Sequence, residues 1–112
     1  MLVSIREEAI RLNQHLTDHV HRGLMFSLGR FSGRIRRVKV TIADVNGPRG
    51  GDDKRCQLTV SGPRLNTVNL TETHANIFAG VDLALDRLAH VIGRSLERAR
   101  DPRATSETRS VT

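Results

Sequence analysis

The sequence predicts an α+β protein of two layers with the order β-α-β-β-β-α, in which a small four-stranded sheet carries two helices packed on one face. Four short segments alternate apolar and polar residues, which is the pattern of half-buried strands. Two longer segments repeat apolar residues every three or four positions, which is the pattern of amphipathic helices. Because each element has a single apolar face, the elements can bury these faces only against one another. A chain of 112 residues has room for one such core.

The first part of the chain predicts a strand followed by a helix. Val3 and Ile5 alternate with polar residues at the start. Asn13 is a suitable N-cap for the helix, and Gly29 and Gly33 are expected to end it. The apolar residues of the helix recur at spacings of four and three: Leu16, Val20, Leu24, Leu28 and Phe31. This spacing places them on one helical face.

The middle of the chain predicts an antiparallel hairpin. Its strands carry alternating apolar residues, Val38, Val40 and Ile42 in the first and Cys56, Leu58 and Val60 in the second. The connection contains Asn46–Gly51, "NGPRGG", whose composition is typical of phosphate-binding loops. It does not match the spacing G-x-x-x-x-G-K-[ST], because Asp52 follows the last glycine and neither Ser nor Thr follows Lys54. We therefore interpret it as a hairpin connection, with Arg49, Lys54 and Arg55 as candidates for contact with a nucleic-acid backbone.

The last part of the chain predicts a weaker fourth strand and a second helix. Val68 and Leu70 indicate the strand, and Thr73 is a suitable N-cap for the helix. The helix carries a continuous apolar stripe of Ile77, Val81, Leu85, Leu88, Ile92 and Leu96. We expect the domain to cover residues 1–100 and residues 101–112 to form a disordered tail, because the tail has one large apolar residue.

The composition favours a polyanionic partner. Eighteen Lys and Arg against 12 Asp and Glu give a formal net charge of +6, and most of the cations are arginines, whose guanidinium matches phosphate oxygens bidentately. Excess charge that serves solubility alone is the other interpretation. The single cysteine and the lack of a basic-then-apolar opening segment predict a reduced, cytoplasmic protein, and no apolar run approaches the roughly 20 residues needed to span a bilayer.

Basic residues fall on the outer faces of both predicted helices. A projection at about 100° per residue places Arg87, Arg94 and Arg98 in one narrow arc, with His90 beside them. On the first helix, the same projection places His15, His19, Arg22 and Arg30 opposite the apolar stripe. Phe26 falls among these residues, where it either stacks on an unpaired base or belongs partly to the core. The arcs predict surfaces that could follow a phosphate backbone.

The sequence gives no support for an enzyme, a cofactor or a metal. His15 and His19 have the i, i+4 spacing of two ligands on one helix, but no third ligand is nearby in the sequence. Cys56 alternates in phase with core residues, which predicts a small buried residue and not a nucleophile. Asp52 and Asp53 are interpreted as charged turn residues, because no apolar pocket is available to separate their pKa values.

Two stretches resemble one known family. "NIFAGVDLALDRL", residues 76–88, is similar to the second-helix signature of the ribosome hibernation promoting factor and ribosome-associated inhibitor family, also called sigma-54 modulation proteins. "LGRFSGRIRRVKVTIADVNGPRGGDDKRC" resembles a short branch of that family. The resemblance extends from Leu2 to about Arg100 and implies the same fold. The sequence departs from the signature at Asn76, where the family usually has Asp, and at Phe78, where it usually has Tyr.

The resemblance implies a cytoplasmic factor that binds the small ribosomal subunit, and its 16S rRNA, in the decoding region and excludes tRNA and mRNA. It also implies no small-molecule substrate, no cofactor and no membrane partner. Together with the charge pattern, it gives these expected rRNA-binding residues: Arg22, Arg30, Arg37, Lys39, Arg87, His90, Arg94 and Arg98. Two alternatives remain open, a generic double-stranded-RNA-binding module, which also has helices on one face of a small antiparallel sheet, and a protein–protein regulator that uses the exposed sheet face.

Overall fold

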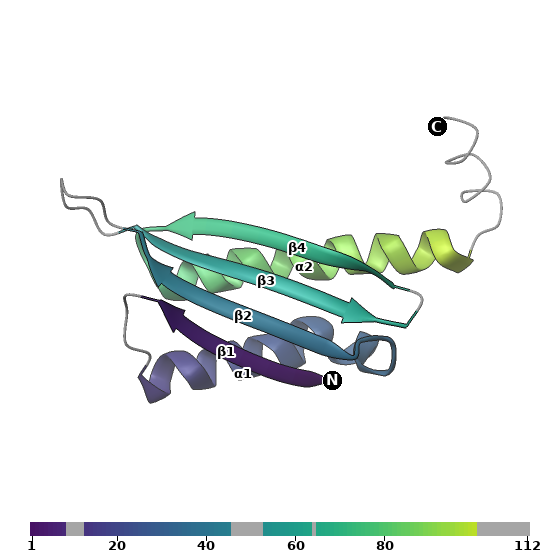
Figure 1. The fold of residues 1–112 in the computed structure, drawn as a ribbon, viewed down its shortest axis with the longest axis horizontal. Helices are drawn as coiled ribbons and strands as arrows, with labels where there is room; N and C mark the ends of the chain where they lie inside the picture. Colours follow the sequence, from purple (N-terminus) through teal and green to yellow (C-terminus); the bar gives the residue numbers. More distant parts are fainter. Residues whose placement is uncertain (9–12, 46–52, 64, 101–112) are drawn as a thin grey trace.

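The fold has the predicted order of elements (Figure 1). The structure, a computed structural model, describes residues 1–8, 13–45, 53–63 and 65–100, without the side chains of 98–100. The connection Asn46–Gly51 and the predicted tail 101–112 lie outside the described residues. The elements are β1 (Leu2–Glu8), α1 (Gln14–Leu28), the 3-10 helix η1 (Gly29–Arg34), β2 (Arg37–Asp44), β3 (Lys54–Gly62), β4 (Leu65–His74) and α2 (Ile77–Arg100).

The four strands form one sheet in the order β1-β2-β3-β4. The predicted hairpin is confirmed, since β2 and β3 are antiparallel and Val40 lies opposite Leu58. The sheet is mixed. β1 runs parallel to β2, with Val3 opposite Val38. The reason is the connection: a strand that returns through a helix can pair in parallel, whereas a short hairpin cannot.

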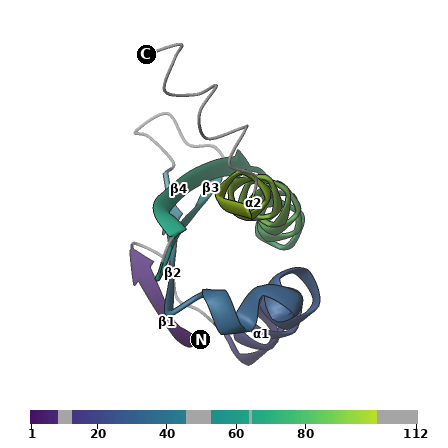
Figure 2. The ribbon, with the colours of Figure 1, turned by 90° about the vertical axis from the view of Figure 1, so that its right-hand side faces the viewer.

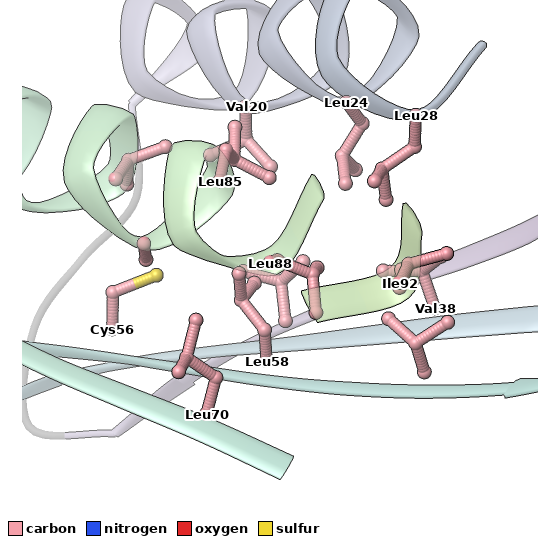
Figure 3. Close-up of a cluster of buried hydrophobic side chains, with 14 of the residues drawn as sticks. Val20, Leu24, Leu28, Val38, Cys56, Leu58, Leu70, Leu85, Leu88 and Ile92 are labelled. Carbon is pink, nitrogen blue, oxygen red and sulfur yellow. The ribbon is translucent and has the colours of Figure 1, made fainter. Parts of the chain in front are cut away.

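Both helices pack on the same face of the sheet, and no helix or strand of the described residues covers its other face, which we call the bare face (Figure 2). The core forms between them, where side chains from α1, α2 and the strands meet (Figure 3). The residues labelled there are almost fully buried: Val20, Leu24, Leu28, Val38, Cys56, Leu58, Leu70, Leu85, Leu88 and Ile92. The apolar stripes predicted from the sequence therefore form the core, with each buried side chain contributing roughly 1.5–3 kcal/mol.

Cys56 lies in this core, as its alternation with Leu58 predicts. Burial, with the negative charge of Glu72 adding to it, raises the pKa of the Cys56 thiol to about 12. The thiol is therefore protonated at neutral pH. Because the thiolate is the nucleophilic form, Cys56 acts as a small packing residue.

Both the start and the end of α1 agree with the prediction. Asn13 is the N-cap, and its side chain accepts a hydrogen bond from the backbone N–H of Leu16 at 2.8 Å. Gly29 is the C-cap of α1, as predicted, and its φ of −54° is right-handed, so the chain continues as the 3-10 helix η1. Phe31 is consequently only partly buried, and Ile35 completes the core after η1.

The predicted cap of α2 was wrong. Thr73 is part of β4, where it pairs with Arg55 of β3. Asn76 is the residue that caps α2, because its side-chain oxygen accepts hydrogen bonds from the N–H groups of Phe78 at 2.9 Å and Ala79 at 3.3 Å. Thr and Asn are both good N-caps, so the position of the cap was decided by how far β4 continues along β3.

The two helices run side by side in the same direction (Figures 1 and 2). Gly23 of α1 allows them to approach, because a Cβ at this position would lie 2.6 Å from the Leu85 side chain of α2. Farther along, Phe31 packs near Gly93. This arrangement brings the outer faces of α1 and η1 next to the outer face of α2.

Candidate nucleic-acid interface

The predicted binding residues lie on two opposite faces of the molecule. Arg22 and Arg30 are exposed on α1 and η1, and Arg87, His90 and Arg94 are exposed on α2. Arg98 is in the last turn of α2, and its side chain lies outside the described part of the chain. The remaining two residues, Arg37 and Lys39, are exposed on β2 and point away from the helices, because they alternate with buried Val38 and Val40. The predicted set is therefore not a single patch.

A hollow between η1 and α2 brings basic residues from both helices together. Its lining consists of Arg30, Ala89, His90, Gly93, Arg94 and Glu97. A second hollow beside it is lined by Arg30, Phe31, Arg34, Gly93, Leu96 and Glu97. The hollows share Gly93, which leaves space on α2 where another residue would place a side chain. Arg30, His90 and Arg94 thus converge, and an arginine that sequence reasoning missed, Arg34, joins them.

Arg30 is held at this hollow by a neighbouring ring. Its guanidinium carbon lies 4.6 Å from the centroid of the Phe31 ring, within the range of a cation–π contact. Phe31 in turn packs near Gly93 of α2. The contact orients the guanidinium without neutralising it, so its N–H groups remain available to a phosphate.

Arg87 is in a different state from Arg94, although the two were predicted together. Arg87 Nη1 lies 2.7 Å from Glu72 Oε2 on β4, which forms an ion pair. The side chain of Arg87 is 54% exposed, whereas that of Glu72 is 23% exposed. Among the described residues, no ion pair involves Arg94. Arg94 can therefore meet a phosphate directly, whereas Arg87 would share its charge with Glu72.

His19 is a contact between the helices and not part of an open basic face. Its Nε2 lies 2.7 Å from Asp82 Oδ1 of α2, and its ring meets the Phe78 ring edge-on at 5.0 Å between centroids. The side chain is 27% exposed. The helical projection placed His19 on the outer face, which was wrong because α2 covers that edge of α1. In the described part of the chain, no group of three or more His, Cys, Asp and Glu residues is placed to hold a metal ion.

On the bare sheet face, a shallow hollow collects the two predicted cations and one more. Arg37 and Lys39 of β2 line it together with Leu2, Val3, Ser4 and Arg6 of β1. Arg6 was missed, although it alternates out of phase with Val3 and Ile5 and therefore could have been assigned to this face.

The opposite end of the sheet holds basic residues that are paired with acids. Lys54 Nζ lies 3.4 Å from Asp44 Oδ2, and Arg55 Nη2 lies 3.6 Å from Glu8 Oε2. These are two of the three residues considered near the glycine-rich connection, and the third, Arg49, is outside the described residues. Lys54 and Arg55 therefore contribute less free positive charge than the sequence implied.

The elements that carry these residues reach opposite ends of the long axis, since β2 begins at one end and both β1 and β2 finish at the other (Figure 1). We call the end at η1 the basic end: Arg30, Arg34, Arg37, Lys39 and Arg94. We call the end where β1 and β2 finish the paired end: Glu8, His19, Asp44, Lys54, Arg55 and Asp82. The fold and this charge distribution define a small basic α+β module of the kind that contacts a polyanion.

The comparison with known families agrees with this class. The model of the family described as sigma 54 modulation protein / S30EA ribosomal protein matches residues 3–100. The chain belongs to this family, as its sequence motifs indicated. Members are ribosome-associated factors and not enzymes, and this description holds for the chain. No curated protein matches the sequence.

Solved structures show the same fold. A ribosomal subunit interface protein from Coxiella burnetii is 14% identical with a TM-score of 0.68, over 84% of this chain and 96% of the other. The N-terminal domain of Thermus thermophilus Protein Y is 22% identical with a TM-score of 0.69, over 84% of this chain and 98% of the other. In the described residues, no helix is long and apolar enough to cross a membrane.

Proposed function

We propose that the protein binds the small ribosomal subunit through its 16S rRNA in the decoding region, excludes tRNA and mRNA, and thereby holds ribosomes inactive in the cytoplasm. The observation that carries this proposal is the position of Arg30, Arg34 and Arg94 around two adjacent hollows at the basic end, with Arg30 lining both of them. Family membership adds ribosome association, and the net charge of +6 adds long-range attraction to RNA.

The chemistry of the proposed contact is electrostatic clamping. Arginines from η1 and α2 donate charge-assisted hydrogen bonds to phosphate oxygens, and each contact is worth about 1.5–3 kcal/mol. Arg37 and Lys39 lie on the bare sheet face, so a second RNA segment can be held there at the same time. A protein held from two sides in this way occupies the space between two RNA elements, and its bulk excludes other ligands from that space.

The test is co-sedimentation of the purified protein with 30S, 50S and 70S particles across a salt series. We expect saturable binding to 30S and 70S particles but not to 50S, with an affinity that falls steeply as salt rises. Prior occupation of the 30S subunit by mRNA and tRNA should prevent binding. Equal affinity for free duplex RNA would favour a generic duplex-RNA-binding module, and absence of binding at low salt would contradict the proposal.

A further inference from the structure

One aromatic residue of the outer helical face differs from the others. The chain has three phenylalanines and neither Tyr nor Trp. Phe31 lies beneath the Arg30 guanidinium, and Phe78 meets His19 edge-on. Phe26 is 93% exposed, the most exposed large hydrophobic side chain in the described part of the chain, and no ring contact there involves it. Its ring therefore contributes little to the core and is open to a partner.

The neighbours of Phe26 are cations. Arg22 lies four residues before it on α1, about one helical turn away on the same side of the helix, and Arg30 lies four residues after it on η1. Both arginines are exposed, and Arg30 also lines the hollow with His90 and Arg94. This part of the surface thus presents a flat apolar ring between two guanidinium groups, which are suited to phosphate.

This arrangement fits a nucleotide better than a protein surface. A strand of RNA offers both a flat aromatic base and negative phosphates on either side of it, and unpaired bases stack on exposed aromatic side chains. We propose that Phe26 stacks on one unpaired base of the RNA that the protein binds, with Arg22 and Arg30 on the flanking phosphates. This inference rests on the proposed ribosomal function and adds a contact that charge alone does not supply.

The test compares substitutions of Phe26 in the full chain, with purified 30S subunits as the probe. Phe26→Ala and Phe26→Leu should both weaken binding by roughly 5- to 150-fold, the range that base stacking supports. Phe26→Trp should bind as tightly as the original protein. The loss should be similar at every salt concentration, because stacking neutralises no phosphate, whereas Arg22→Ala should reduce the salt slope by about one.

The tryptophan variant also gives a direct signal. Because the chain has no other Trp, Phe26→Trp provides a single fluorophore at the proposed contact. Stacking on a base should quench its emission when 30S subunits are added, and excess unlabelled original protein should restore it. Emission that shifts to the blue without quenching would indicate burial against protein and would overturn the proposal.

Met25→Ala is the matched control, since Met25 is the adjacent residue and is 61% exposed. Met25→Ala should leave binding to 30S subunits unchanged. Neither Met25→Ala nor Phe26→Ala should change the midpoint of thermal unfolding. Full affinity of Phe26→Ala or Phe26→Leu, or an equal loss in Met25→Ala, would overturn stacking while leaving the ribosomal function intact. If the original protein self-associates and Phe26→Ala abolishes this self-association, the Phe26 ring packs against a second copy of the chain. That result would also overturn stacking on RNA. If the original protein does not bind 30S subunits, both proposals fall.

Discussion

The two ends of the molecule use the same kinds of charged residue in different ways. At the paired end, Lys54 of β3 faces Asp44 of the neighbouring β2, and Arg55 of β3 faces Glu8 of β1 across β2. His19 faces Asp82 across the two helices. At the basic end, Arg30, Arg34 and Arg94 line open hollows with a single carboxylate, that of Glu97, among the residues that form the lining. A cation that is paired with a carboxylate of the same chain connects two strands or helices of the fold. An unpaired cation is available to a ligand.

The comparison teaches that position in the fold, and not residue type, separates unpaired cations from cations that are paired with a carboxylate. Arg87 and Arg94 fall in one arc of α2, yet Glu72 partners only the first of them. The difference arises because Arg87 lies above β4, which supplies the carboxylate. Each prediction below changes one of the two ends.

The largest effect is expected from Gly62→Ala, because this glycine supports the basic end. A Cβ at position 62 would lie 2.1 Å from the backbone oxygen of Arg34, so η1 would have to move. We expect a loss of about 3 kcal/mol in the free energy of unfolding, the upper part of the usual range for overpacking. Urea unfolding measures this loss, and a change below about 0.5 kcal/mol would show that η1 does not pack tightly here.

Removing two cations from the basic end should produce the next largest effect. The double variant Arg30→Ala with Arg94→Ala should weaken binding to 30S subunits by roughly 100-fold at low salt and reduce the salt slope by about two. The matched control is Lys54→Ala with Arg55→Ala, which removes the same charge from the paired end and should change affinity by less than about fivefold. Equal losses in the two double variants would break the distinction between the ends.

His19→Ala should weaken the fold and spare binding. The substitution removes the contact with Asp82 and the edge-on contact with Phe78. We expect a loss of about 1 kcal/mol in the free energy of unfolding, measured by urea denaturation, because one hydrogen bond at a partly exposed site is worth about that much. Affinity for 30S subunits should stay within twofold of the original. A large loss of affinity with unchanged stability would instead assign His19 to the binding surface.

The smallest effect is expected from Lys54→Ala alone. Its ion pair with Asp44 spans 3.4 Å between the end of β2 and the start of β3, and an ion pair that keeps contact with solvent contributes roughly 0–1 kcal/mol. Thermal unfolding at low and at high salt should show a small loss that salt diminishes. A loss above about 2 kcal/mol would mean that this pair stabilises the sheet, and the paired end would then be more than a set of weak surface contacts.

The sequence was sufficient to predict the elements, because their signals are local. Alternation in β2 and β3 and the apolar stripe of α2 each follow from the geometry of one element, and all were confirmed. The same reasoning was less successful where two local signals competed. Thr73 and Asn76 are both good caps, and only the length of β4 decided between them.

The candidate site was predictable only in part. Helical projection identified Arg22, Arg87 and Arg94 as exposed, since exposure opposite an apolar stripe is a property of one helix. It could not identify Arg34, which follows the glycine that was expected to end the helix. Nor could it place Arg37 and Lys39 on a different face from the helical arginines, because that requires knowing which side of the sheet the helices cover.

The sequence by itself thus determined the class, the order of the elements and most residues of the core, because hydrophobic periodicity fixes the face that each element buries. Only the tertiary structure decided which charges meet. The close approach of α1 and α2 at Gly23 places His19 beside Asp82, and the continuation through η1 places Arg30 beside Arg94. Contacts of this kind depend on distances between elements that are far apart in the chain, and no local pattern records those distances.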